Sequence, residues 1–285
     1  MEGLVGIGIA SLASHSVQTV IGQPEAPSLY HALLSLPDPM FHLRTWVEME
    51  HRVFHRSAPQ LYRPAEMDEE KWLEVWRQFA GIGLSEAGWV FHDLPTQEQR
   101  RIVADLAAAR REQMIPAAVA YFAERGGNEA ALREEAERNP YPLLARYMTT
   151  TMDEFMRRSA VAAQLPFADA YPQLRELSDQ AEQVEWWHGP GNEGLAFPPD
   201  RALIAIARYR QSVAMTIVLE ALRDHAAEHG GWPESLDELR LYVPDDPISG
   251  EAFEYARDGD TAILRAAADQ RLPSGYEWRI TLRRK

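Results

Sequence analysis

The chain has 285 residues, 46% of them hydrophobic, which is enough for a substantial core and argues against disorder over most of its length. Acidic residues outnumber basic ones by 43 to 29, giving a formal charge of −14, and the excess holds both before and after residue 198. Because nucleic-acid-binding proteins present clustered Lys and Arg to phosphate, we expect no nucleic-acid partner. Cysteine is absent, which excludes disulfides, thiolate metal ligands and cysteine nucleophiles.

The N-terminal segment, residues 3–24, contains no Asp, Glu, Lys or Arg. Its composition resembles that of a secretion signal, but Glu2 stands where a signal carries positive charge. Ser14 and His15 make the segment too polar for a membrane span. We interpret it as a buried helix that lacks a convincing signal, and a signal peptide is the alternative.

Apolar residues at helical spacing, separated by Gly and Pro, predict helices over almost all of the first 187 residues. Asp68 is expected to cap one of them, and Pro116 to kink or divide the longest. Short turns between successive helices favour an irregular bundle or solenoid. The predicted helices cover residues 3–21, 29–36, 40–55, 68–79, 95–125, 129–138, 142–164 and 172–187.

A loop rich in Gly and Pro follows residue 187 and predicts a boundary between a helical domain, residues 1–197, and an α+β tail, residues 198–285. The tail opens with a long amphipathic helix, residues 199–230, in which Arg208 and Glu220 argue against a membrane span. Alternating residues then predict three antiparallel strands, with the long helix packed on one face of the sheet. These strands cover residues 253–257, 261–265 and 276–282. The predicted fold class is therefore mainly α, and α+β overall.

The tail carries a resemblance to a known family. Residues 228–239 read EHGGWPESLDEL, and the motifs PDDPISG at 244–250 and FEY at 253–255 follow. This stretch, about residues 215–265, resembles the C-terminal part of bacterial type II secretion pseudopilins, in which a long helix leads into a small sheet. The charge-poor membrane segment and processing site of pseudopilins do not precede this helix, so the resemblance does not extend to filament assembly.

A wider resemblance covers nearly the whole chain. Its motifs are GLVGIGIA at 3–10, QPEAPSLYHAL at 23–33, LP at 36–37 and ITLR at 280–283. They resemble a family of large uncharacterised bacterial proteins whose members have a secretion signal and further helices upstream. The resemblance implies a periplasmic or cell-envelope location and a chain that starts inside the family's pattern. It implies no activity.

The best metal candidate is a set of three residues on one predicted helix. Glu48, His51 and His55 lie at i, i+3 and i+7, so that they share a helical face and offer ligands suited to zinc. The pattern is not the HExxH motif, because Arg52 follows the first histidine. The simpler interpretation is a pair of exposed histidines.

Acidic turns give a second metal candidate. Asp245, Asp246, Asp258 and Asp260 lie in turns that flank the predicted sheet, where carboxylates supply the hard oxygen ligands that calcium prefers. Asp-Pro and Asp-Gly pairs are also ordinary turn formers, so that a purely structural role is the alternative.

Aromatic residues suggest a partner-binding surface. Trp186 and Trp187 are adjacent and cannot both face inward from one helix, so we expect one of them to contact a protein or peptide partner. Trp72, Trp76 and Phe79 have helical spacing and are expected to pack in the core.

Two functional hypotheses result. The first is a non-catalytic helical scaffold or binding module with a protein or peptide partner, because no catalytic signature is present. The alternative is a metal-dependent hydrolase that uses Glu48, His51 and His55.

Overall fold

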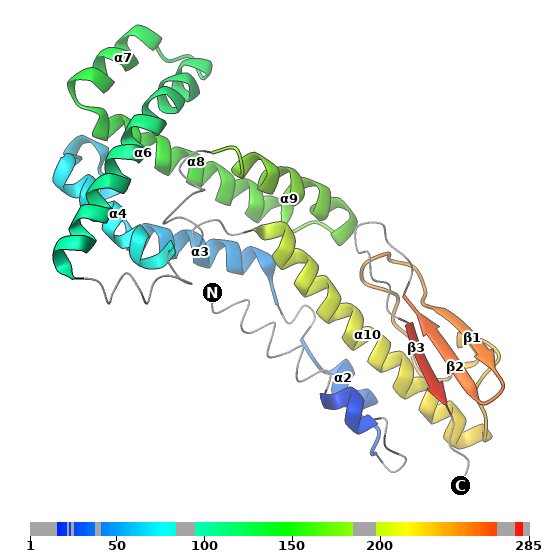
Figure 1. Cartoon of the computed structure of the whole chain (residues 1–285). Coiled ribbons are helices and arrows are strands. Elements are labelled where there is room, and N and C mark those ends of the chain that lie inside the picture. Colours follow the sequence, from blue (N-terminus) through cyan, green and yellow to red (C-terminus); the bar gives the residue numbers. More distant parts are fainter. Residues whose placement is uncertain are drawn as a thin grey trace. The chain divides into compact units, whose positions relative to one another are not determined.

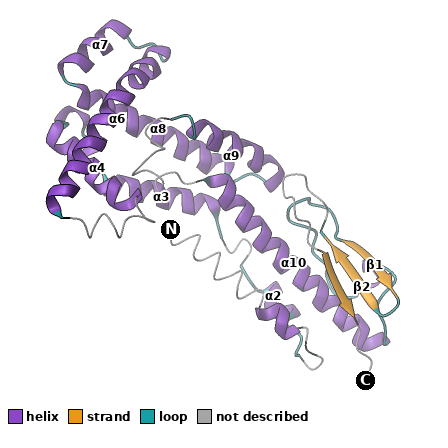
Figure 2. Ribbon diagram, in the orientation of Figure 1, coloured by secondary structure: helices purple, strands orange, loops and turns teal. Residues whose placement is uncertain are grey.

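The computed structural model describes residues 16–21, 23, 26–37, 41–83, 95–184, 198–266 and 277–281. The fold is mainly α-helical, with a small antiparallel sheet after a long helix, and this confirms the predicted fold class (Figures 1 and 2). The chain divides into two compact units. The helical unit comprises residues 44–164 and 172–199, and the α+β unit comprises residues 1–43, 165–171 and 200–285. The described residues before 43 thus group with the tail, whereas the predicted boundary places them in the helical domain.

The described helices overlap the predicted ones, and most of the first predicted helix, residues 3–21, lies outside the described residues. Two differences involve proline: α6 runs undivided through Pro116, and α9 starts at Phe167 and includes Pro172, which was expected to begin it. Asp68 caps α4 as expected, since its Oδ1 accepts the backbone N–H of Lys71 at 2.9 Å. The elements up to α9 are α2 (Tyr30–Leu34), α3 (Leu43–Ser57), η1 (Pro59–Tyr62), η2 (Pro64–Glu66), α4 (Glu69–Gly83), α6 (Thr96–Glu124), α7 (Glu129–Arg138), α8 (Pro140–Ala162) and α9 (Phe167–Ala181).

The core of the helical unit is aromatic. Trp72, Trp76 and Phe79 of α4 are fully buried, which confirms the core role predicted from their spacing. The indole Nε1 of Trp72 donates to the carbonyl oxygen of Ala107 in α6 at 3.0 Å. Phe54 of α3 stacks on Phe79 with 5.9 Å between ring centroids. These contacts join α3 and α6 through α4.

The α+β unit is built on α10 (Pro199–His229), followed by η3 (Leu236–Glu238) and the strands β1 (Glu254–Asp258), β2 (Thr261–Arg265) and β3 (Glu277–Thr281). The strands form an antiparallel sheet in the order β1-β2-β3, in which Leu264 of β2 pairs with Tyr255 on one side and Trp278 on the other. The inward positions of β2, Ala262 and Leu264, are completely buried. The alternation of apolar and polar residues in the sequence therefore corresponds to a sheet with one covered face, as predicted.

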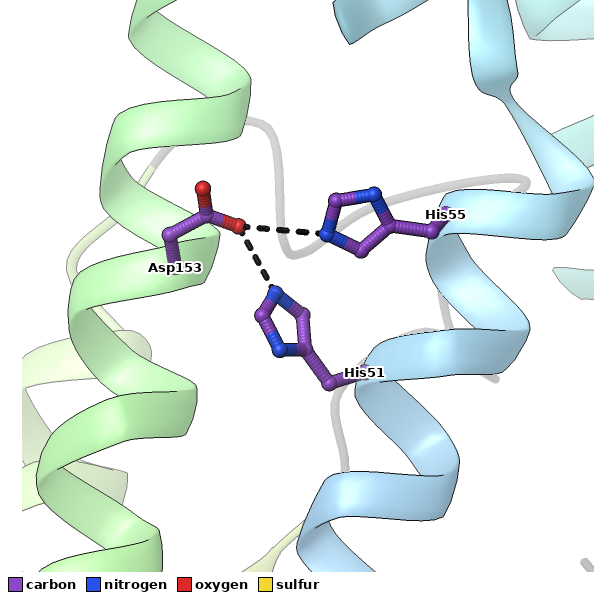
Figure 3. Close-up of side chains that lie close together, drawn as sticks. All are labelled: His51, His55 and Asp153. Atoms are coloured by element: carbon purple, nitrogen blue, oxygen red, sulfur yellow. Dashed lines mark hydrogen bonds and ion pairs between the residues drawn. The ribbon is translucent and has the colours of Figure 1, made fainter.

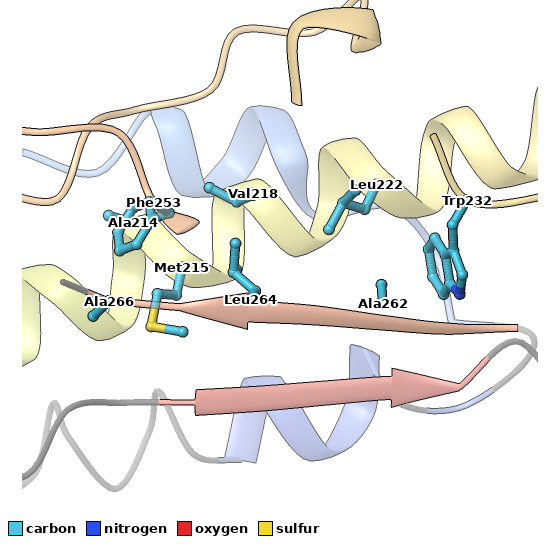
Figure 4. Close-up of a cluster of buried hydrophobic side chains, with 9 residues drawn as sticks. All are labelled: Ala214, Met215, Val218, Leu222, Trp232, Phe253, Ala262, Leu264 and Ala266. Carbon is cyan, nitrogen blue, oxygen red and sulfur yellow. The ribbon is translucent and has the colours of Figure 1, made fainter. Parts of the chain in front are cut away.

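Helix α10 covers that face. Met215, Val218 and Leu222 of α10 belong to one buried cluster with Leu264 of β2 (Figure 4). Trp232 closes the end of the cluster, and its Nε1 donates to the carbonyl oxygen of Asp260 at 2.8 Å. The sheet and the helix thus share one hydrophobic core.

A second contact explains why the segment before residue 43 belongs to this unit. The side chain of Glu220 is fully buried, accepts the backbone N–H of Leu29 at 2.7 Å and forms an ion pair with Arg223. Arg223 in turn donates to the carbonyl oxygen of Ala26 at 2.9 Å. Because a buried carboxylate is costly without partners, this network fixes the segment against α10.

Among the described helices, α10 is the one that is long and apolar enough to cross a membrane by length and composition. In its most apolar stretch, 67% of the residues are buried inside the protein. Packing against the sheet and α2 accounts for this apolar character.

Asp246 gives a test of how the loop before the sheet is held. It is completely buried, and its carboxylate accepts Gln211 Nε2 at 2.9 and 3.0 Å and the N–H of Ile248 at 2.9 Å. We expect Asp246→Ala to lower the free energy of unfolding by about 2–3 kcal/mol in urea titrations, since both donors lose their acceptor. The exposed neighbour Asp245 supplies the control, because Asp245→Ala should change stability by less than about 0.5 kcal/mol. Equal effects of the two substitutions would contradict this role.

Candidate metal centre

The helical unit brings two histidines and one carboxylate together. His51 and His55 lie one turn apart on α3, and Asp153 faces them from α8 (Figure 3). One ligand atom from each lies within 4.8 Å of the other two. Among the described residues, these three side chains form the one group of possible metal ligands whose atoms lie this close together.

The distances are close to those of a zinc site. His51 Nε2 lies 2.7 Å from Asp153 Oδ1, and His55 Nε2 lies 3.8 Å from the same oxygen. In a tetrahedral zinc site with ligands at about 2.0–2.1 Å, neighbouring ligand atoms are about 3.3 Å apart. The two observed separations lie on either side of that value.

Tyr62 supports the carboxylate from η1. Its hydroxyl donates to Asp153 Oδ1 at 3.0 Å, and its ring stacks on His55 with 3.6 Å between centroids. Burial, the charge of Asp153 and this hydrogen bond all raise the pKa of Tyr62 far above its ordinary value. The phenol therefore stays protonated and acts as a donor to the carboxylate.

The hydrogen bonds of Asp153 indicate how the three side chains would bind a metal ion. Asp153 Oδ1 accepts Tyr62 Oη–H and contacts His51 Nε2, which serves as the donor when it carries the proton. A metal ion at this site would take the place of that proton, and the imidazole hydrogen would then lie on Nδ1. The Tyr62 hydrogen bond would orient the carboxylate, as outer-shell donors do in known metal sites.

The protonation state of His55 also favours a metal. Burial and the neighbouring His51 lower the pKa of His55, and Asp153 opposes the shift in part. Because the ordinary pKa of histidine is about 6.5, His55 is neutral at pH 7, and neutral imidazole is the form that binds metal.

Glu48 does not belong to this cluster. Its carboxylate accepts Arg44 Nε at 2.8 Å and lies 3.9 Å from Arg52. Of the predicted set of Glu48, His51 and His55, the structure places the two histidines together with Asp153 and leaves Glu48 outside the group. Spacing within one helix offered no sign of Asp153, which lies 102 residues from His51 in the chain.

The four aspartates proposed for calcium do not come together as ligands within the described part of the chain. Asp246 is buried and occupied by Gln211 and Ile248, while Asp245 and Asp258 are exposed. Asp260 uses its carbonyl oxygen to accept from Trp232. The turn-forming interpretation holds for Asp246, and the calcium site is not supported. Trp186 and Trp187 lie outside the described residues.

Comparisons with protein-family models, curated proteins and solved structures gave no match for this chain. The resemblances noted from sequence motifs therefore stay expectations.

His55 predicts a specific pH dependence for the metal-free protein. Folding lowers the pKa of His55, so the unfolded chain binds this proton more tightly than the folded chain does. The contribution of His55 to the free energy of unfolding is therefore fully present above about pH 6.5 and falls as the pH is lowered. We expect chelator-treated protein to lose more stability between pH 7.5 and 5.5 than the His55→Asn variant does, as measured by urea unfolding. An identical loss in the two proteins would show that His55 does not contribute.

Proposed function

We propose that this protein is a non-catalytic helical binding module whose helical unit holds a divalent transition metal, with zinc the best match, through His51, His55 and Asp153. The observation that carries the proposal is the convergence of two imidazoles and one carboxylate from two helices. Two nitrogens and one oxygen suit zinc, whereas calcium and magnesium require shells of oxygen. A water molecule would complete the tetrahedron.

The metal would act as a cross-link. It joins α3 to α8 at positions 102 residues apart in the chain, and the unfolded chain has no such site ready. Binding therefore adds to the free energy of unfolding. A structural role fits the exposure of the site, since the side chains of His51, His55 and Asp153 are 30%, 42% and 47% exposed. A catalytic metal is more often enclosed in a pocket.

Zinc titration tests the proposal directly. We expect chelator-treated protein to bind one zinc ion per chain in calorimetry, and zinc at about 100 times its dissociation constant to add about 2.7 kcal/mol to the free energy of unfolding. His51→Ala and Asp153→Asn should each weaken binding at least about a hundredfold, because each removes a ligand or its charge.

Two further variants make the titration specific. Glu48→Gln changes a carboxylate on the same helix that pairs with Arg44, and it should leave zinc affinity within about threefold. Tyr62→Phe keeps the ring that stacks on His55 but loses the hydroxyl. It should lower the affinity for zinc about tenfold with unchanged stoichiometry. Zinc binding that survives in His51→Ala at full strength would overturn the proposed site.

A metal-dependent hydrolase is the second candidate. The observation that favours it is the number of protein ligands: three leave a fourth position for water, which is the pattern of catalytic zinc sites. Glu48 has no place in this version as a metal ligand.

An activity assay separates the two candidates. Zinc-loaded protein would be assayed with p-nitrophenyl acetate and bis(p-nitrophenyl) phosphate beside the Asp153→Asn variant. Turnover present in the native protein and lost in the variant would establish the hydrolase. The binding-module proposal expects no difference between the two proteins.

The location in the cell is also a proposal. The resemblance of residues 228–239 to the pseudopilin tail motivates a periplasmic or cell-envelope setting and a protein or peptide partner. Fractionation of cells that produce the protein tests the setting.

A further inference from the structure

A groove lies between the second half of α6 and α7, within the helical unit and apart from the metal ligands. Its volume is about 600 Å³, and its lining includes Val119 and Ala123 from α6 and Ala136 from α7. Glu124 and Glu137 lie at its edge and are exposed. The groove is therefore apolar inside and carries carboxylates at its rim.

The turn between the two helices creates this groove. Gly126 has a φ of 91°, which favours glycine, and a Cβ at Gly127 would lie 2.8 Å from the carbonyl oxygen of Phe122. Asn128 then caps α7 by accepting the N–H of Ala131 at 3.2 Å. The chain turns back at once, and the small side chains at the α6–α7 junction leave a hollow between the helices.

The charges at the rim are unequal. Arg133 neutralises Glu129, with its guanidinium nitrogens 3.0 and 2.6 Å from Oε1. The side-chain carboxylates of Glu124 and Glu137 form no hydrogen bond or ion pair with any residue that the structure describes. Two free carboxylates therefore flank the apolar floor, in a chain whose formal charge is −14.

We propose that this groove binds an amphipathic helix of a partner protein, with its apolar face on the α6–α7 floor and Lys or Arg beside Glu124 and Glu137. A groove between two helices with small residues at its base suits a helix laid along it, since Ala permits a close approach. The unpaired carboxylates select a basic flank and repel anionic partners, including acidic membrane surfaces. The net negative charge of the chain speeds the approach of such a partner. The inference is independent of the metal site.

The experiment uses the full chain and two fluorescent peptides of about 18 residues, the length of about five helical turns. One is an amphipathic Leu/Lys helix, and the other carries Glu in place of Lys. We expect the Leu/Lys peptide to bind with a dissociation constant at least about tenfold lower than that of the Leu/Glu peptide in fluorescence anisotropy. A ratio near one would overturn the proposal.

Charge reversal separates the groove from general attraction to an acidic protein. The double variant Glu124→Lys/Glu137→Lys should lower the affinity for the Leu/Lys peptide at least about tenfold. Glu98→Lys/Asp105→Lys is the matched control, because it reverses two exposed carboxylates elsewhere on α6 and changes the net charge equally. Equal losses in the two double variants would overturn the proposal in favour of nonspecific attraction.

Filling the groove gives a second, uncharged test. Ala120→Trp places a bulky ring at an exposed position of the groove lining. It should also lower the affinity for the Leu/Lys peptide at least about tenfold, while the helicity of the protein measured by circular dichroism stays unchanged. Unchanged peptide binding in this variant would overturn the groove as the site. A native dimer that this substitution dissociates, seen by sedimentation, would instead assign the groove to a second copy and overturn the proposed partner.

Discussion

Burial of the aromatic side chains of α4 is the constraint on which the helical unit depends. Trp72, Trp76 and Phe79 have almost no exposed surface, and removing each large apolar side chain from water contributes about 1.5–3 kcal/mol. Through them α4 contacts Phe54 of α3, the backbone of α6 and Tyr141 of α8, whose ring centroid lies 6.1 Å from that of Trp72. This packing sets α3 and α8 so that His51 and His55 face Asp153. Side chains held in place by packing lower the cost of binding.

The α+β unit rests on a different constraint, the burial of α10 on more than one side. Met215, Val218 and Leu222 pack on the sheet, while Ile217 and Ala221 pack on Tyr30. A helix with apolar contacts on two sides looks membrane-like by composition, although its neighbours within the protein account for its residues. The buried Glu220 has a structural explanation as well, because it accepts the N–H of Leu29 and pairs with Arg223.

Local patterns in the sequence predicted the secondary structure. They did not predict contacts between residues that are distant in the sequence. Helix α7 and strand β2 coincide with their predicted ranges, since capping residues and alternation act over a few positions. The grouping of residue 29 with α10 escaped prediction, because it depends on Glu220, 191 residues away. Asp153 was missed for the same reason. Glu48 was chosen because it shares a helical face with His51, but neighbouring arginines occupy its carboxylate.

In the proposed site, two imidazoles of α3 and one carboxylate of α8 hold a metal ion. X-ray absorption at the zinc edge of the zinc-loaded protein tests it most directly, because the spectrum reports the ligands themselves. We predict four nitrogen or oxygen ligands at about 2.0 Å, with outer-shell scattering from two imidazoles. A six-coordinate shell of oxygen, or a spectrum without imidazole scattering, would contradict the proposed site.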